Sequence, residues 1–102
     1  MFFITSDTDL VLQDKIQSLY FYASWMPYHK KMLVMLDKME DKYPNIDFIG
    51  IDIDFFKTFI KRFKIDSIPT VLLINNGKEI KRLNGLVLTS AIKSTFADIC
   101  KI

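Results

Sequence analysis

The sequence Tyr-Ala-Ser-Trp-Met-Pro-Tyr-His-Lys occupies residues 22–30 and is the strongest indication of the fold. It follows an apolar run over residues 18–23, which is typical of a strand buried on both faces. From Pro27 to Lys42 the apolar period changes to that of a helix. Proline suits a first helical turn, where its missing N–H costs no hydrogen bond. The stretch therefore predicts a junction between a buried strand and an amphipathic helix.

One face of this predicted helix is apolar and includes His29. Charged side chains occupy the opposite face. We expect His29 to be a partly buried core histidine that is neutral near pH 7, because burial and a helix N-terminus both disfavour an imidazolium. Proton transfer and metal ligation are the alternatives. The apolar positions are His29, Met32, Leu33, Leu36 and Met39 or Glu40.

The segments on either side predict further elements. Residues 2–4 indicate a short strand, and Ser6 or Asp7 indicates the cap of a weak helix that reaches about Asp14. Residues 47–52 predict a strand, and Asp54 is in place to cap a following helix. The apolar face of that helix would consist of Phe55, Phe56, Phe59, Ile60 and Phe63.

The remaining third of the chain predicts a hairpin and a last helix. Residues 70–74 and 79–83 are strand-like, and Asn75-Asn76-Gly77 between them is typical of a tight antiparallel turn. Gly85 ends the second strand, and Thr89 or Ser90 would cap a helix whose core positions are Ile92, Phe96 and Ile99. The resulting order, β-α-β-α-β-α-β-β-α, predicts an α/β domain with a central mixed sheet flanked by helices on both faces.

This order, together with four motifs, resembles the thioredoxin family over essentially the whole chain. Residues 22–30 look like the family's A-x-W-C-x-x-C-K, and Ile68-Pro69-Thr70 matches its I-P-T. The hairpin Asn76-Gly77-Lys78 and the later Gly85 also match. The resemblance implies one thioredoxin-like domain over residues 1–102 and a cis peptide bond before Pro69. It also implies that the Pro69 loop faces the tetrapeptide at residues 26–29.

The chain departs from the family where the family carries its chemistry. The two redox cysteines map onto Met26 and His29, and the buried strand acid maps onto Tyr20. Disulfide exchange needs an attacking thiolate and a second thiol that resolves the mixed disulfide. A thioether and an imidazole can do neither, so the usual dithiol-disulfide reductase route is excluded unless a second chain supplies sulfur. We therefore expect no catalytic residue here.

The resemblance also implies a shallow apolar groove that takes an extended peptide. It predicts a non-enzymatic module that binds a peptide or a protein. The alternative is a relative of thiol-disulfide oxidoreductases with a residual or partner-dependent role in cell redox homeostasis. A relic groove without a ligand is the third possibility. The groove would be lined by Trp25, Pro27, Tyr28, Ile68, Pro69 and Met26, the last as an exposed apolar residue.

Composition restricts the other classes of function. The 102 residues suffice for one domain, and 14 basic against 12 acidic residues indicate neither a nucleic-acid nor a membrane partner. Met26 and His29 are too few to make a selective Cu(I) site, so neither a metal nor another cofactor is expected. The single thiol, Cys100, indicates a reducing, cytoplasmic setting. We expect a monomer, with a Cys100-linked dimer as the alternative.

Overall fold

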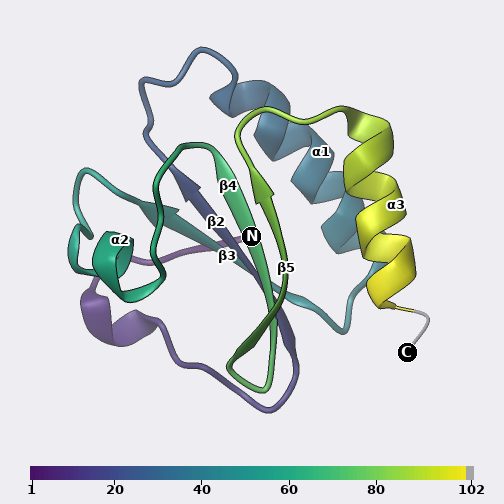
Figure 1. The fold of residues 1–102 in the computed structure, drawn as a ribbon, viewed down its shortest axis with the longest axis horizontal. Helices are drawn as coiled ribbons and strands as arrows, with labels where there is room; N and C mark the ends of the chain where they lie inside the picture. Colours follow the sequence, from purple (N-terminus) through teal and green to yellow (C-terminus); the bar gives the residue numbers. More distant parts are fainter. Residues whose placement is uncertain (101–102) are drawn as a thin grey trace.

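The computed structural model describes residues 1–100, so the last two residues of the predicted domain lie outside the described part. A 3-10 turn, η1, takes the place of the first predicted helix. Figure 1 shows the order of the elements, which are β1 (Phe2–Phe3), η1 (Asp7–Asp9), β2 (Ile16–Tyr22), α1 (His29–Lys42), β3 (Asp47–Asp52), α2 (Thr58–Arg62), β4 (Thr70–Asn75), β5 (Lys78–Asn84) and α3 (Thr89–Ile99).

The five strands form one mixed sheet in the order β1-β3-β2-β4-β5. Strands β1 and β2 both run parallel to β3, whereas β4 is antiparallel to β2 and to β5. The turn between β4 and β5 has Asn76 and Gly77 at φ 52° and 75°. Two successive positive φ angles are characteristic of a type I′ turn, which explains why Asn-Gly closes this hairpin.

The sheet separates two apolar cores. In Figure 1, α1 and α3 cover one face, and α2 with η1 lies on the other. Alternate residues of β2 point to opposite faces, so Tyr20 packs with α1 and α3 while Leu19 and Phe21 pack with α2. The predicted strand buried on both faces, the mixed sheet and its two helical layers are thus confirmed.

The helix predicted over residues 6–14 is wrong, because only η1 forms there. A capping box closes η1, and the chain is already extended at Leu10, whose side chain is buried. The segment between η1 and β2 is held by the side chain of Gln17, which is fully buried in β2. The Gln17 side-chain amide donates to the Val11 carbonyl and accepts from the Gln13 N–H. These hydrogen bonds fix an irregular path along the sheet in place of a helix.

Three predicted helix starts also need correction. Helix α1 begins at His29, so Pro27 lies in the turn before it. Helix α2 begins at Thr58 with Lys57 as its N-cap, and the side chain of Asp54 accepts from a tryptophan N–H instead of capping the helix. Helix α3 begins at Thr89 without a side-chain cap, since the Thr89 hydroxyl donates to Met35 Sδ at 2.9 Å. Core positions of α3 were nevertheless predicted correctly: Ile92, Phe96 and Ile99.

No helix within residues 1–100 combines the length and the apolar character that a bilayer crossing requires.

Candidate functional site

The tetrapeptide at residues 26–29 follows β2, and Ile68 and Pro69 immediately precede β4. Phe21 of β2 is paired with Thr70 of the antiparallel β4, so the end of one strand lies beside the start of the other. Figure 1 shows both loops at the upper end of the sheet. Strand pairing therefore brings the two halves of the predicted groove to one edge.

Two backbone hydrogen bonds shape the tetrapeptide. The Met26 N–H donates to the Ala23 carbonyl at 3.0 Å, and the His29 N–H donates to the Met26 carbonyl at 3.2 Å. The resulting turns leave Trp25 and Tyr28 69% and 50% exposed. Large apolar side chains with this exposure indicate a surface that can bind a partner.

Met26 differs from its expected role, because it is only 8% exposed and belongs to the core shared with α1 and α3. The bond from its N–H to Ala23 turns the chain back toward α1, which carries the thioether inward. A ligand on this surface would meet Trp25, Pro27 and Tyr28, all of which are exposed. The half of the groove formed by residues 25–28 therefore has three exposed lining residues, and Met26 is part of the protein core instead.

The indole of Trp25 is tied to the segment that follows β3. Its Nε1–H donates to Asp54 Oδ2 at 2.9 Å. The Asp54 carboxylate is also on the surface, so the bond fixes a flat aromatic ring across the edge of the sheet without burying it. A ring held in this way loses little conformational freedom when a ligand binds.

His29 forms a polar pair with Tyr20, the residue at the position of the family's buried acid. The Tyr20 Oη and His29 Nδ1 atoms are 2.9 Å apart, and the ring of Tyr22 stacks on His29 with 4.5 Å between centroids. Burial raises the pKa of Tyr20, so its hydroxyl keeps the proton at neutral pH. It can then donate to an unprotonated Nδ1 of neutral His29.

Burial lowers the pKa of His29, and the nearby Asp52 carboxylate opposes that shift. The direction agrees with the expectation that His29 is neutral near pH 7. Because its pKa is below the unfolded value, the unfolded state binds more protons as the solution becomes acidic. The contribution of His29 to stability is therefore complete above about pH 6.5 and declines as the pH falls toward its folded pKa.

The sequence contains one histidine, so its titration can be followed without ambiguity. We expect NMR of the imidazole protons to give a midpoint below the ordinary value of about 6.5. Tyr20→Phe removes the hydroxyl that favours the neutral ring and should raise the midpoint. Tyr43→Phe, a phenol that stacks on Phe96 away from His29, is the control and should leave it unchanged. A midpoint that is insensitive to Tyr20→Phe would contradict the pairing.

The second half of the groove is the loop before β4. The Ile68–Pro69 peptide bond is cis, in agreement with the expectation from sequence. Ile68 is half-buried and Pro69 is buried. The Pro69 carbonyl accepts from the Gly85 N–H at 2.7 Å, whereas neither the N–H nor the C=O of Ile68 is hydrogen-bonded to another of residues 1–100. Ile68 therefore offers both backbone groups to a ligand.

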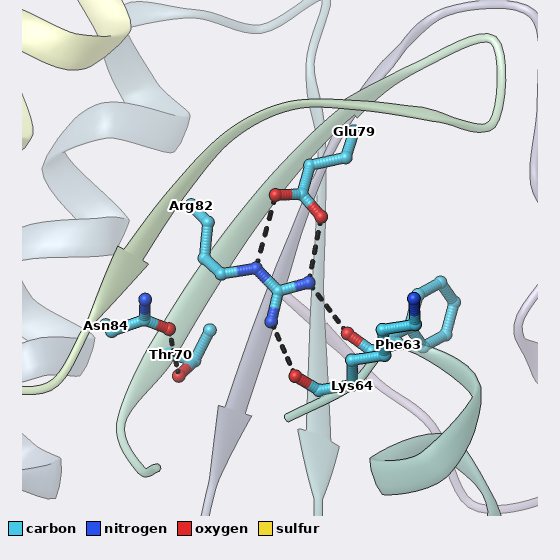
Figure 2. Close-up of polar contacts among 6 residues, drawn as sticks. All are labelled: Phe63, Lys64, Thr70, Glu79, Arg82 and Asn84. Carbon is cyan, nitrogen blue, oxygen red and sulfur yellow. Dashed lines mark hydrogen bonds and ion pairs between the residues drawn. The ribbon is translucent and has the colours of Figure 1, made fainter. Parts of the chain in front are cut away.

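Side chains of β4 and β5 hold this loop in place. The Thr70 hydroxyl donates to the Ser67 carbonyl at 2.7 Å and lies 3.4 Å from Asn84 Oδ1. Figure 2 shows Arg82 of β5 reaching the end of α2, where it donates to the Phe63 and Lys64 carbonyls at 2.7 and 2.9 Å. The Glu79 carboxylate accepts from the same guanidinium and orients it. The loop is thus anchored at both ends.

A small cavity of about 200 Å³ opens beside the loop. Ile68 contributes to its wall, and three further isoleucines make it mainly apolar. Its dimensions suit one aliphatic side chain of a ligand. The lining residues are Ile53, Ile60, Ile65, Asp66, Ser67 and Ile68.

A second cavity, of about 480 Å³, lies at the same edge of the sheet and was not predicted. Asp52, at the end of β3, is paired with Tyr22, at the end of β2, and both line this cavity. A usable signal in the sequence is the position of Asp52 at the carboxyl end of a predicted strand, because the carboxyl ends of parallel strands meet at one edge of a sheet and bind ligands there. The sequence pattern alone identifies Asp52 only as the last residue of a strand.

Cys100 is remote from these groups. It is the C-cap of α3 and lines another cavity, with residues 42–46, at the opposite end of the sheet (Figure 1). Burial raises the pKa of its thiol, which lowers the thiolate fraction at neutral pH. No group of three or more metal-ligating side chains occurs within residues 1–100.

Comparisons with known proteins agree on one family. The family model described as Thioredoxin matches residues 5–98. Thioredoxin-1 of Saccharomyces cerevisiae is 33% identical over 87 residues, which cover 85% of this chain and 84% of the relative. Among solved structures, a thioredoxin of Nicotiana alata superposes with a TM-score of 0.86 at 25% identity, over 95% of this chain and 90% of the other.

Oxidised mitochondrial thioredoxin 3 of Saccharomyces cerevisiae gives a TM-score of 0.83 at 26% identity, covering 96% of this chain and 94% of the other. The resemblance inferred from the motifs is thereby confirmed at the level of sequence and of fold.

Proposed function

Since this chain belongs to the thioredoxin family and yet has Cys100 as its only cysteine, we propose that it is a non-enzymatic module that binds an extended peptide or a protein. The observation that carries the proposal is the loop at Ile68, which keeps an unbonded backbone N–H and C=O beside an apolar cavity. An extended peptide can pair with those two groups as an added strand and place an aliphatic side chain in the cavity.

The exposed rings support the same proposal. Trp25 and Tyr28 provide rigid apolar surface, and aromatic residues of this kind dominate the binding energy of many interfaces. Trp25 is held by Asp54, and the Ile68 loop is held by Thr70 and Arg82. The binding surface is therefore ordered before a ligand arrives, which lowers the entropic cost of association.

Capture of an immobilised library of extended peptides tests the proposal. We expect wild type to retain a subset of peptides and Ile68→Asp to bind them at least about tenfold more weakly, because an unpaired carboxylate would occupy the apolar cavity. Trp25→Ala should also weaken capture. Ile80→Asp is the matched control, since it introduces the same charge at an exposed position of β5. Melting curves of all variants verify folding.

Equal, negligible capture by wild type and by Trp25→Ala/Ile68→Asp would remove the proposal. So would undiminished capture by the folded double variant.

A second candidate function is favoured by the relatives themselves, which are named thioredoxins. In this alternative the chain retains a residual redox role through Cys100, or a role that depends on sulfur supplied by a partner. It differs from the first proposal in requiring electron transfer, and the activity measurement in the Discussion separates the two.

A further inference from the structure

The cavity at the ends of β2 and β3, here called the acidic cavity, is also lined by the segments that follow β1 and β3, and it combines aromatic walls with a buried carboxylate. Its volume is about 480 Å³, and Asp52, which lines it, is only 9% exposed. Asp52 Oδ1 accepts from the Asp54 N–H at 2.9 Å. No Lys or Arg within residues 1–100 forms an ion pair with Asp52 or Asp54. Among residues 1–100, the carboxylate of Asp52 therefore lines the cavity without a Lys or Arg ion-pair partner.

Three aromatic residues line the same cavity as the Asp52 carboxylate. Tyr22, Phe55 and Phe56 line the cavity, and Phe55 is 77% exposed. The pKa of Tyr22 is raised by burial and further by the Asp52 carboxylate, which places the negative charge close to its ring. Aromatic faces attract cations, and a carboxylate beside them adds a charge-assisted hydrogen bond. Ile4 and Thr5 complete the lining.

The position of the cavity connects it to the proposed groove. Asp52 lines the acidic cavity, and the next residue, Ile53, lines the apolar cavity beside Ile68. Asp54 then binds the Trp25 indole. Three consecutive residues thus line the acidic cavity, line the apolar cavity and bind the exposed tryptophan, which places these three features at the same edge of the sheet.

We propose that the cavity lined by Tyr22, Asp52, Phe55 and Phe56 is a subsite for a Lys or Arg side chain of the bound peptide. This inference rests on the proposed function, because the peptide is the source of the cation. It adds a specificity: the preferred ligand carries a basic residue close to the aliphatic residue that enters the apolar cavity. The cationic head would meet the Asp52 carboxylate, and its methylene stem would pack on the phenylalanine rings.

The test uses n-butylguanidinium chloride as a probe and the neutral N-butylurea as its comparison. Both are titrated into the ¹⁵N-labelled protein while amide signals are followed by NMR. We expect saturable shifts at residues 52–56 with the guanidinium only. Asp52→Asn keeps an oxygen for the Asp54 N–H and should weaken binding about tenfold. Asp41→Asn, an exposed α1 position with the same change in net charge, should not.

Equal responses to the two probes in wild type would overturn the subsite, and this comparison needs no variant. An unchanged affinity in folded Asp52→Asn would also overturn it.

The peptide library separates the two proposals. If peptides are captured with no preference for Lys or Arg, the subsite is wrong and the groove stands. If the guanidinium binds but no peptide is captured, a peptide is not the source of the cation, and this inference falls with the proposed function. A preference for basic residues that Asp52→Asn abolishes, while capture of neutral peptides is retained, supports both.

Discussion

The unmodified protein is expected to reduce insulin disulfides no faster than the reagent blank. Reduction needs a thiolate and a resolving thiol, and the chain offers only Cys100. Burial raises the pKa of that thiol, and Cys100 lines a cavity with Ile16 and Asn75, at the end of the sheet opposite to the tetrapeptide. A turbidity assay with dithiothreitol and a reductase-coupled assay measure the rate, and Saccharomyces cerevisiae Thioredoxin-1 serves as the reference.

Turnover by wild type at a rate comparable to that of the reference would end the non-enzymatic proposal. Cys100→Ser then identifies the source of any activity: its loss in this variant would establish the residual redox role, and its persistence would exclude Cys100.

Restoring two cysteines to the tetrapeptide tests whether its backbone still permits a disulfide. The variant Met26→Cys/His29→Cys places a cysteine at each end of a turn. This turn is closed by the hydrogen bond from the His29 N–H to the Met26 carbonyl. A β-turn keeps its end Cα atoms within about 7 Å, and a disulfide needs about 4.4–6.8 Å. We expect this variant to form an intramolecular disulfide on oxidation, detectable by thiol titration. Failure to form it would mean that the backbone here is unsuited to a Cys-x-x-Cys bridge.

Tyr20→Asp, which restores the acid of the resembling family, is expected to destabilise the protein strongly. Tyr20 is fully buried, stacks on Tyr22 and pairs with His29. Removing most of a buried aromatic side chain costs about 3–5 kcal/mol, and the new carboxylate would be buried without a cation. The total is comparable to the stability of a small domain, about 5–15 kcal/mol. Urea unfolding monitored by circular dichroism measures the change.

The free energy of unfolding of Tyr20→Asp should also depend on pH. Burial should raise the pKa of the introduced carboxyl above its unfolded value, so its folded state favours the protonated form. The penalty is then smallest below about pH 4 and grows as the pH rises through the unfolded pKa toward the folded one. Tyr20→Phe, which keeps the ring, should cost only about 1 kcal/mol at pH 7. Equal stability of Tyr20→Asp and wild type would show that this position is not the buried environment described.

The local sequence pattern was sufficient to predict an element where a local preference decided its structure. The strand at residues 47–52 was predicted with its observed bounds, and Asn76-Gly77 predicted the hairpin, because few residues tolerate two positive φ angles. Prediction failed where a local preference met a stronger tertiary contact. Pro27 is compatible with a first helical turn, but hydrogen bonds of the preceding turn postpone α1 to His29.

The candidate site shows the same division. Its two halves, at Trp25 and at Ile68-Pro69, were predicted from motifs. The exposure of its members was not, because burial depends on how a turn is oriented against the rest of the fold, as the inward position of Met26 demonstrates. The acidic cavity at Asp52 was also missed, since it is made by strands that are distant in sequence.

The amino-acid sequence by itself determined the family, the order of the elements and the absence of a cysteine pair, since each of these is a property of residue identity and spacing along one chain. Only the tertiary structure decided the partner of His29, the burial of Met26 and the joining of Tyr22, Asp52 and Phe55 around one cavity. The pairing of β2 with β3 and β4 brings these residues together. Contacts across a sheet depend on the register between strands, which the spacing of residues within any single strand does not specify.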